Sequence, residues 1–571
     1  MGRMLSTMQD IPLSIARILD YGATVHGNTV VTTWSVDGPQ TTTFREIAAR
    51  AAALAHALRD DLGITGDQRV GSFMYNCAEH LEVMFGVSAM EAVFTPLNKQ
   101  LMNDQISHII RHAEIEVIVA DLRLLGQLEQ VLVDTPSIRA VAVIGTGDVP
   151  AEIAGVPVHS YEALLDDRST ALDWPAQDEH AAAAICYSTG TTGPPKGVAY
   201  SQRSVYLQAM SLRTTDSLAV THGETFLCGV PIYHVLSWGI PFAAFMSGTP
   251  LVLPDADVSA PTLAKIIEAT HPRVAHGVPS LWTQLMVHYL HEPPSRMSLT
   301  EIYVGGSPAS PSLIKIWEER YGVDIVHVWG MTETSTVGTV ARPPSGASGE
   351  ARMVYRSSQG RFAPSLEYRV VHDGAVVAST DRNQGEIQVR GNLVAASYLR
   401  SDAVDEFRGE NIPDGSGGDE KFTADGWLRT GDVGSVTSDG FLVISDRARD
   451  VIRSGGEWIY SAQLENVIME ADEVVECAVI GMPDKKWGER PLAVTVLHDG
   501  VPPTAETAEA IRATVRSQLP NWMVPEYWSF VDHIDKTSVD KFDKKDLRSH
   551  LAGDELEIVK LRGPGESKQL R

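Results

Sequence analysis

The segment Tyr187-Ser-Thr-Gly-Thr-Thr-Gly-Pro-Pro-Lys-Gly197 directly follows an apolar run, Ala181–Cys186, with the composition of a buried strand. Its glycines let the backbone turn tightly and bring N–H groups against an anion. Its Ser and Thr hydroxyls add hydrogen-bond donors, and Lys196 adds a point charge that suits phosphate. The segment therefore predicts a phosphate-binding loop at the end of a buried strand.

This loop differs from the P-loop of NTPases. A P-loop needs Gly-Lys-Ser/Thr running into a helix. Here Pro194-Pro195 precede Lys196 and stiffen the chain at that point. Taken alone, the composition is also compatible with an ordinary polar loop, so the rest of the chain has to decide.

The first half of the chain alternates helix and strand patterns. Thr43-Phe-Arg-Glu46 is a capping box that opens a helix, and a second helix is expected over Leu81–Val93. Short aliphatic runs separated by helices predict parallel sheets buried on both faces, which is an α/β fold. These runs are Val117–Ala120, Val141–Ile144 and Ala181–Cys186, and Arg69–Met74 is a further strand candidate.

The pattern of predicted elements changes after about residue 345. Strands such as Glu386–Arg390 become shorter and more antiparallel, and Gly409–Asp419 has the composition of an exposed loop. Beyond Asp446 a smaller α+β unit is expected, followed by a frayed tail over Gly563–Arg571. The elements predicted for it are strands Cys477–Ile480, Leu492–Leu497 and Tyr527–Val531, and a helix over Thr504–Leu519.

Charge and composition exclude several functional classes. The 571 residues carry a formal net charge of −26, which argues against nucleic-acid binding while leaving room for a small anionic substrate. The four cysteines lie far apart with no CxxC pair, which fits a reducing cytosol better than a disulfide framework or a zinc site. The sequence has no apolar run of the ~18 residues that a membrane span requires, so we expect a cytoplasmic protein without stable membrane insertion.

The phosphate loop resembles the signature of the adenylate-forming superfamily, which includes acyl-CoA synthetases, adenylation domains of peptide synthetases and beetle luciferases. Six further segments resemble the motifs of that superfamily, in the same order, between about residues 20 and 550. They are PIYHVLSWG from Pro231, GGSPA from Gly305, VWGMTETS from Val328, GWLRTGD from Gly426, DRARDVIRSGGEWIYS from Asp446 and DKTSVDKFDKKDLR from Asp535.

This resemblance implies a domain organisation. The large N-terminal domain, residues 1–446, would hold two parallel α/β sheets and a distorted β-barrel, together with the ATP and acyl sites. Residues 447–450 would form a hinge, and residues 451–571 a small mobile α+β domain that rotates between two half-reactions.

The resemblance also implies roles for individual residues. Glu333 would bind Mg²⁺ with Ser188 nearby, and Lys196 and Thr332 would assist catalysis. Asp432 would accept hydrogen bonds from the ribose, and Arg447 would meet ribose or phosphate. Trp329 and the turn Gly305-Gly306-Ser307 would form the adenine pocket, and Gly455 and Gly456 would make room for the pantetheine arm of CoA. The other motif positions expected to contact ATP or CoA are Thr189, Gly190, Thr191, Thr192, Gly193, Gly330, Arg449, Arg453 and Trp458.

Lys541 resembles the mobile lysine that stabilises the transition state of adenylation. The sequence departs from the superfamily pattern here, because Asp540 stands where glycine is usual and Asp535 where proline is usual. A carboxylate next to Lys541 favours the charged ammonium and offers a competing ion pair. This departure bears on the efficiency of the first half-reaction.

The segments PIYHVLSWG and SGGEWIYS are most similar to the fatty acyl-CoA synthetase branch. By this resemblance His234 lines the acyl entrance and Trp238 gates a hydrophobic tunnel. We therefore expect a ligase that activates a medium- or long-chain fatty acid with ATP and Mg²⁺ and transfers it to CoA. The alternatives left open are an acyl-AMP ligase that serves a carrier protein, a CoA ligase for another small carboxylic acid, a luciferase-like oxygenase and a non-catalytic binding protein. Whether the chain forms a homodimer is also left open.

Overall fold

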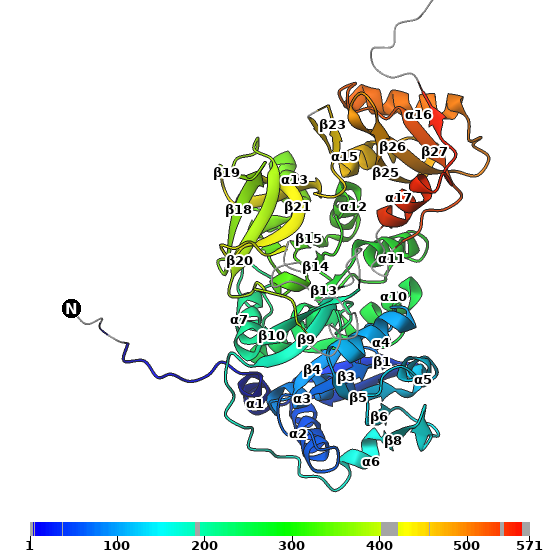
Figure 1. Ribbon diagram of the computed structural model, residues 1–571. Coiled ribbons are helices and arrows are strands. Elements are labelled where there is room, and N and C mark those ends of the chain that lie inside the picture. The colour runs from blue at the N-terminus through cyan, green and yellow to red at the C-terminus, as the bar shows by residue number, and fades with distance from the viewer. Residues whose placement is uncertain are drawn as a thin grey trace, which may run out of the picture. The chain divides into compact units, whose positions relative to one another are not determined.

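The computed structural model describes residues 4, 6–36, 38–188, 194–400, 421–455, 457–536 and 542–561. Its contacts divide the chain into two compact units (Figure 1). Unit 1 comprises Met1–Glu367 and Arg390–Leu428, and unit 2 comprises Tyr368–Val389 and Arg429–Arg571. The loop predicted over Gly409–Asp419 and the tail predicted over Gly563–Arg571 lie outside the described residues.

An eight-stranded sheet in unit 1 carries the strand that leads into the phosphate loop. Its six central strands are parallel, and an antiparallel strand closes each edge. In spatial order the strands are β10 (Lys196–Ser201), β9 (Ala182–Ser188), β4 (Val93–Pro96), β3 (Arg69–Phe73), β5 (Ile115–Asp121), β6 (Ala140–Ile144), β8 (Val156–Ser160) and β7 (Glu152–Ile153).

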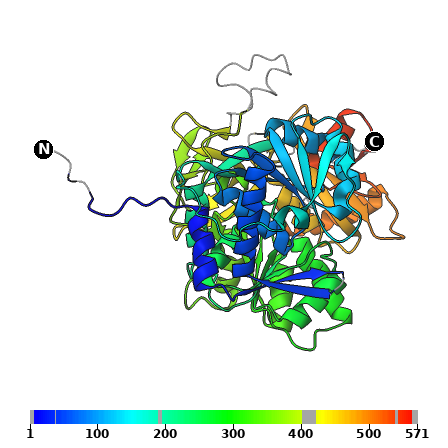
Figure 2. The same cartoon turned by 90° about the horizontal axis from the view of Figure 1, so that it is seen from below.

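A second, mostly parallel sheet in unit 1 is built around the middle of the chain. Strands β1 and β2, blue in Figure 2, lie at one edge of this sheet. β1 pairs in parallel with β12, and β2 pairs antiparallel with β1 and is the last strand. The strands in spatial order are β2 (Gly38–Thr43), β1 (Val30–Ser35), β12 (Leu251–Leu253), β11 (Phe226–Cys228), β13 (Val274–Gly277), β14 (Glu301–Val304), β15 (Asp324–Trp329), β16 (Thr339–Val340) and β17 (Gly360–Phe362). The predicted α/β class is confirmed by these two sheets.

The helices of unit 1 follow the strands in α/β fashion. They are α1 (Ile15–Val25), α2 (Phe44–Asp60), α3 (Ala78–Ala89), α4 (Asn103–His112), α5 (Leu125–Leu132), α6 (Tyr161–Leu165), α7 (Gln202–Leu212), α9 (Ile240–Ser247), α10 (Ala260–Thr270), α11 (Pro279–His291), α12 (Pro311–Tyr321) and α13 (Gly349–Ser357), with short 3₁₀ turns η1 (Leu122–Leu124) and η2 (Thr332–Thr334). The segment labelled α8 (Val235–Trp238) is described below with the site.

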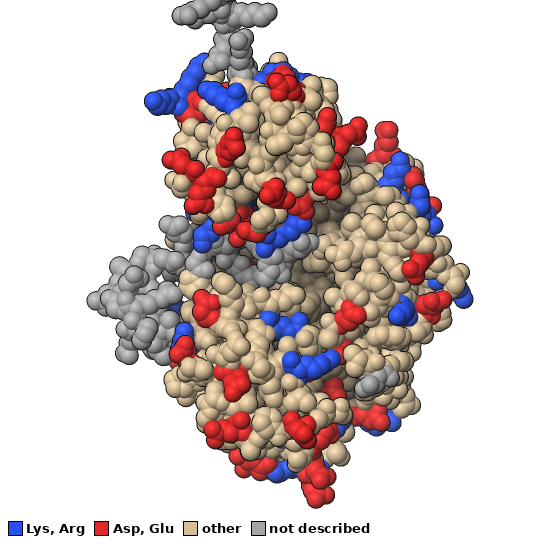
Figure 3. Space-filling view, turned by 90° about the vertical axis from the view of Figure 1, so that its right-hand side faces the viewer, with Lys and Arg blue, Asp and Glu red and all other residues tan. Residues whose placement is uncertain are grey.

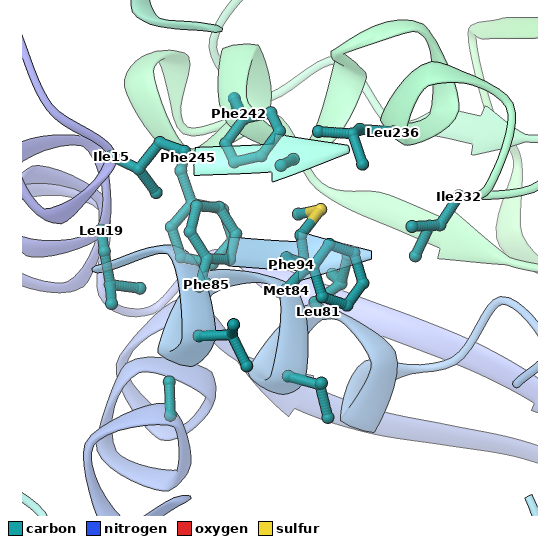
Figure 4. Packing of buried hydrophobic residues seen from close by; sticks show 14 of the residues in the cluster. Ile15, Leu19, Leu81, Met84, Phe85, Phe94, Ile232, Leu236, Phe242 and Phe245 are labelled. Carbon is teal, nitrogen blue, oxygen red and sulfur yellow. The ribbon is translucent and has the colours of Figure 1, made fainter. Parts of the chain in front are cut away.

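Aromatic side chains join helices α2, α3 and α9 in the largest core cluster of unit 1 (Figure 4). Phe44 stacks on Phe245 with 3.9 Å between ring centroids, and Phe85 lies 4.4 Å from Phe245 and 5.2 Å from Phe242. A Cβ atom added at Gly22 of α1 would lie 2.5 Å from the Phe245 ring, so glycine lets α1 approach this cluster. The apolar run of α9 is therefore accounted for by core packing alone.

Two local predictions can be compared with the structure directly. The capping box at Thr43 and Glu46 is confirmed, and it starts α2. The helix expected over Leu81–Val93 ends at Ala89, and Val93 begins strand β4 instead. Continuous apolar residues do not distinguish a buried helix from the buried strand that follows it, which explains the difference.

Unit 2 begins with five adjacent strands, of which the pairs β18–β19 and β21–β22 are antiparallel. Their spatial order is β19 (Ala375–Val377), β18 (Leu366–His372), β20 (Gly385–Gly391), β21 (Leu428–Val436) and β22 (Phe441–Arg447). The distorted barrel expected in this region stays a prediction. The C-terminal part has the expected α+β pattern. Its strands are β23 (Ile452–Ser454), β24 (Glu457–Ile459), β25 (Val474–Asp484), β26 (Gly488–Leu497), β27 (Tyr527–Phe530) and β28 (Val559–Lys560), and its helices are α15 (Ser461–Ile468), α16 (Ala505–Gln518) and α17 (Lys544–Ala552).

The surface agrees with the charge argument. On the face shown in Figure 3, acidic and basic side chains alternate in small groups, and no broad basic surface is visible there. Within the described part of the chain, every helix is too short or too polar to cross a bilayer.

Candidate active site

The described ends of the phosphate loop are held by a β-hairpin. Strands β9 and β10 pair antiparallel, with Ser188 opposite Lys196 and Tyr187 opposite Gly197. The predicted ligands between them, Thr189–Gly193, lie outside the described residues. The hairpin register therefore brings the Ser188 hydroxyl and the Lys196 ammonium to neighbouring positions at the mouth of the loop.

Glu333 lies on η2, just beyond the end of β15, with 3% of its surface exposed. The Tyr398 hydroxyl donates a hydrogen bond to Glu333 Oε1, and Lys421 Nζ lies 3.4 Å from the same oxygen. Lys196 Nζ lies over the Tyr398 ring, 4.9 Å from its centroid. Two predicted residues thus contact the same tyrosine side chain, Lys196 at the face of the ring and Glu333 at the hydroxyl.

Backbone contacts fix this arrangement. The Tyr200 hydroxyl donates to the Thr332 carbonyl at 2.6 Å, and the Ala395 N–H donates to the Glu333 carbonyl at 2.8 Å. A Cβ atom added at Gly330 would lie 1.5 Å from the Thr336 carbonyl oxygen, so glycine is required there. Burial raises the pKa of Tyr398, and the negative charge of Glu333 raises it further, so its hydroxyl stays a donor.

The residues predicted for the adenine pocket lie at the carboxyl ends of two adjacent parallel strands. Gly305 and Gly306 follow β14, and Trp329 is the last residue of β15. A Cβ atom at Gly305 would lie 2.7 Å from the Val328 carbonyl oxygen, so the turn at Gly305 lies directly against β15. Ser307 continues this turn. In open α/β sheets this edge is where ligands bind.

The motif that carries His234 and Trp238 has an unusual backbone. Four successive non-glycine residues, 235–238, have positive φ angles of 35°, 54°, 53° and 55°, and Gly239 follows with 77°. Left-handed helical geometry costs an L-residue about 1–2 kcal/mol. Such a segment persists only where its surroundings fix it. We call residues 235–239 the gate turn.

The gate turn is packed against two parts of the site. The backbone of Val235 and Leu236 donates hydrogen bonds to the thiol of Cys186, at the end of β9, and burial raises the pKa of this thiol to about 12. The Trp238 indole lies against Gly305, where an added Cβ would be 3.0 Å from it. The predicted gate thus contacts both the phosphate-loop strand and the predicted adenine turn.

His276 on β13 contacts two residues of the gate turn. Its ring lies edge-on to Trp238 at 5.1 Å, and Nε2 lies 3.2 Å from both the hydroxyl and the carbonyl oxygen of Ser237. The Val230 N–H donates to Nδ1 at 3.4 Å, so the proton of the neutral ring resides on Nε2. Burial lowers the pKa of His276 to about 4, which keeps the ring neutral.

Unit 2 holds the predicted ribose ligand in a short ion pair. Asp432 on β21 faces Arg447 on β22, and Arg447 Nη1 lies 2.8 Å from Asp432 Oδ1. Asp432 is 3% exposed, whereas Arg447 remains about half exposed. In the predicted hinge, burial lowers the pKa of Arg449, and its guanidinium lies 3.8 Å from Asp450.

Further residues predicted to contact ATP or CoA form a second group in unit 2. Arg453 and Trp458 face each other across the β23–β24 hairpin, and the guanidinium lies 6.0 Å from the indole centroid. A Cβ atom at Gly455 would lie 2.7 Å from the Trp487 ring. Gly456 and Lys541 lie outside the described residues, so their roles stay predictions.

Two residues of the Glu333 cluster were missed at the sequence level. Tyr398 and Lys421 lie outside the quoted motifs, and no local pattern marks either of them. Only the tertiary contact with Glu333 reveals them. Among the described residues there is no cluster of three or more His, Cys, Asp or Glu side chains able to hold a metal ion, so a metal at Glu333 would depend on one carboxylate.

Comparison with known proteins places these motifs in a family. Residues 19–399 match the family described as AMP-binding enzyme, and residues 463–541 match the AMP-binding enzyme C-terminal domain. The chain is 34% identical over 555 residues to the 3-methylmercaptopropionyl-CoA ligase of Ruegeria pomeroyi, covering 96% of this chain and 99% of that one.

A second relative acts on a different acid. The medium-chain-fatty-acid–CoA ligase of Ectopseudomonas oleovorans is 33% identical over 550 residues, covering 95% of this chain and 97% of the relative. Among solved structures, that of the anthranilate CoA ligase AuaEII with anthranoyl-AMP covers 96% of this chain and all of its own with a TM-score of 0.81. At 23% identity the last similarity establishes the fold alone.

Proposed function

The chain belongs to the AMP-binding enzyme family, and from this membership we propose that it is an ATP-dependent fatty acid–CoA ligase. A carboxylate oxygen of the acid attacks the α-phosphorus of ATP, and pyrophosphate leaves. The thiol sulfur of CoA then attacks the carbonyl carbon of the acyl adenylate, forming the thioester and releasing AMP. We propose a medium- or long-chain fatty acid as the substrate.

The observation that carries this proposal is the meeting of Lys196 and Glu333 at Tyr398. Adenylation brings two anions together, so the site has to supply positive charge near the phosphates and a defined orientation. Lys196, at the exit of the phosphate loop, supplies the charge, and the cation–π contact with Tyr398 fixes its position. Glu333 accepts a hydrogen bond from the hydroxyl of the same tyrosine and supplies the negative charge of the site.

Glu333 is suited to hold Mg²⁺. A carboxylate that is 3% exposed needs a compensating cation, and the Lys421 ammonium at 3.4 Å already provides one. Mg²⁺ requires few protein oxygens when phosphate supplies others, so Glu333 with the Ser188 hydroxyl would be sufficient. When bound, the metal would neutralise charge on the phosphate oxygens. Tyr398 would orient the Glu333 carboxylate toward it.

The remaining predicted residues are proposed to bind the other substrates. The Gly305–Ser307 turn and Trp329 would bind adenine, and the Asp432 carboxylate would accept hydrogen bonds from ribose hydroxyls. His234 and Trp238 would border the acyl chain. Arg453 and Trp458 would contact CoA.

Two relatives support different acids, so the substrate class needs a direct test. The fatty-acid proposal is supported by the E. oleovorans relative and by the buried indole of Trp238 at the gate turn. The R. pomeroyi relative favours a short thioether acid as the second candidate. A hydrophobic pocket separates neighbouring chain lengths by only about 1–3 kcal/mol per methylene, so sequence similarity leaves chain length open.

The deciding experiment supplies ATP, Mg²⁺ and CoA with straight-chain acids from C4 to C18 and with 3-methylmercaptopropionate, and follows pyrophosphate and thioester together. The proposal expects the highest kcat/KM for an acid of C8 or longer, with equal yields of both products. A preference for 3-methylmercaptopropionate would support the second candidate. Pyrophosphate without thioester would instead indicate transfer to a carrier protein.

A matched pair of variants tests the site in the same assay. Glu333→Gln removes the buried carboxylate and is expected to lower pyrophosphate release by about two orders of magnitude or more, as loss of a charge-stabilising group does. Glu319→Gln changes a carboxylate on α12 that is 63% exposed, and it is expected to leave the rate unchanged. Equal activity of the two variants would contradict the role of Glu333.

A further inference from the structure

A second left-handed turn follows Glu333. Ser335 and Thr336 have φ angles of 49° and 75°, two residues beyond the carboxylate. The Thr336 N–H donates to the Met331 carbonyl at 3.1 Å, and the Ser335 hydroxyl donates to the Leu393 carbonyl at 2.9 Å. The position of Glu333 is therefore tied to a backbone conformation that is unfavourable for both of these residues.

One buried side chain joins this turn to the gate turn. Gln208 projects from α7 and is 5% exposed. Its Nε2 donates one hydrogen bond to the Ser335 carbonyl and lies 3.5 Å from the Trp238 carbonyl oxygen. Both neighbours are carbonyl oxygens, which only accept, so the amide nitrogen of Gln208 has to face them.

The geometry around Gln208 leaves little freedom. A Cβ atom added at Gly239 would lie 2.8 Å from the Gln208 amide carbon and oxygen, so the side chain is packed directly on the gate turn. A shift of the Trp238 backbone therefore has to move the amide or break its hydrogen bond. The amide in turn contacts the carbonyl two residues after Glu333.

We propose that Gln208 is a positioning residue that couples the gate turn to the Glu333 segment, so that the acid and the nucleotide bind cooperatively. This inference rests on the proposed function, in which Trp238 borders the acyl chain and Glu333 lies at the ATP phosphates. Binding at either end stabilises one geometry of its own left-handed turn. The Gln208 amide then favours the matching geometry of the other turn.

Coupling of this kind is a ratio of affinities and is reciprocal. The experiment measures binding of octanoate and of palmitate by titration calorimetry, with and without Mg²⁺ and α,β-methylene-ATP, which does not release pyrophosphate. For the wild-type protein we expect the nucleotide analogue to tighten binding of at least one acid by about five-fold or more. The acid is expected to tighten binding of the analogue by the same factor.

Gln208→Met keeps the length and burial of the side chain and removes both donors. It is expected to reduce the coupling factor to below about two-fold while each ligand alone still binds. Gln202→Met is the matched control. Gln202 is a second buried glutamine of α7, and it bonds to the Ser88 carbonyl at 2.8 Å and to the Ile15 N–H at 2.9 Å, away from both turns. This control is expected to keep the full factor.

A coupling factor that is unchanged in Gln208→Met, or absent from the wild-type protein although both ligands bind, would overturn the proposal and leave the ligase function standing. Failure of the wild-type protein to release pyrophosphate with any acid would instead overturn the proposed function. If Gln208→Met does not fold, Gln208→Leu removes both donors with an apolar side chain that cannot hydrogen-bond in any protonation state. It is expected to lose the coupling, and full coupling in that variant would also refute the proposal.

Discussion

At the scale of single residues, the contacts of Glu333 with Tyr398 and Lys421 add to the interpretation of the motif that carries Glu333. The family resemblance predicts that Glu333 binds Mg²⁺, and the structure places a phenol hydroxyl and an ammonium group at its Oε1. Lys421 therefore stands where a metal ion would compete with it. If the two cations compete for Glu333, removal of Lys421 changes the Mg²⁺ requirement of the enzyme, whereas an ion pair that only stabilises the fold would leave that requirement unchanged.

Lys421→Met is expected to lower the Mg²⁺ concentration that half-saturates pyrophosphate release by about three- to ten-fold, which corresponds to roughly 1 kcal/mol of relieved competition. The measurement is a Mg²⁺ titration at fixed ATP. Lys315→Met, which removes an exposed partner of Glu319 on α12, serves as the control. An unchanged Mg²⁺ requirement together with a higher KM for ATP would assign Lys421 to the nucleotide instead.

His276 provides a prediction about pH. Its pKa is lowered from 6.5 to about 4 in the folded protein, so the unfolded chain binds more protons between these values. Stability due to the neutral ring is therefore complete above pH 6.5 and is lost as the pH falls toward 4. The slope is about 1.4 kcal/mol per pH unit for one such histidine.

His80 and His327 share this behaviour, because burial also lowers their pKa values to about 4. His276→Gln should flatten the pH dependence of the thermal unfolding midpoint between pH 6.5 and 4 without abolishing it. His291→Gln, at the exposed end of α11, should leave it unchanged. Parallel pH profiles of wild type and His276→Gln would contradict this account.

At the scale of elements, the sequence predicted where helices and strands lie along the chain better than it predicted the backbone conformation of the turns between them. The capping box of α2 and the apolar strand that leads into the phosphate loop follow from local patterns, whereas strand β10, which completes the hairpin, was not predicted. The gate turn does not follow from a local pattern either, because Val235–Trp238 has the composition of an ordinary apolar helix. Its left-handed backbone arises from contacts with Cys186, His276 and Gly305, which are distant in sequence.

Helix α4 gives a prediction that also depends on such distant contacts. His112 Nδ1 lies 2.7 Å from the Tyr187 hydroxyl, and His108 Nε2 lies 3.3 Å from the Pro195 carbonyl oxygen. The two rings stack at 5.5 Å. One helix thus holds both described ends of the phosphate loop, which should preorganise the loop for ATP.

A double-mutant cycle tests this support. His112→Phe and Tyr187→Phe each remove one partner of the same hydrogen bond, and each is expected to lower kcat/KM for ATP. Because the partner is shared, the double variant should be no worse than the poorer single variant, with a coupling energy of about 1 kcal/mol. Additive losses would show that the two side chains act on the loop separately.

At the scale of the whole molecule, each of the two compact units is built from two separate stretches of the sequence. Residues 368–389 join unit 2, although residues 390–428, which include Tyr398 and Lys421, belong to unit 1. A linear sequence provides no signal for such an exchange. The predicted hinge, Arg447–Asp450, lies within unit 2, and the domain boundaries assigned around it stay predictions.

Helix α17 connects that hinge to the segment that carries Lys541. Arg548 Nη2 lies 2.5 Å from Asp450 Oδ1, and Lys544 Nζ lies 2.6 Å from Glu465 and 2.7 Å from the Ser461 hydroxyl. The helix begins three residues after Lys541. A rotation at the hinge would therefore carry α17 with it, because these partly buried ion pairs hold the helix to the chain around the hinge.

The final prediction separates the two half-reactions on this basis. Lys541→Ala is expected to lower acid-dependent pyrophosphate release by about two to three orders of magnitude, because a positive charge is lost from the adenylation transition state. Thioester formation from supplied acyl adenylate and CoA should change little. Lys545→Ala, which alters an exposed lysine of α17, is the control for both steps. Asp540→Gly removes the neighbouring carboxylate that favours a competing ion pair, so it should accelerate pyrophosphate release alone. Equal losses in both half-reactions for Lys541→Ala would mean that Lys541 supports the fold or the whole cycle rather than the first chemical step.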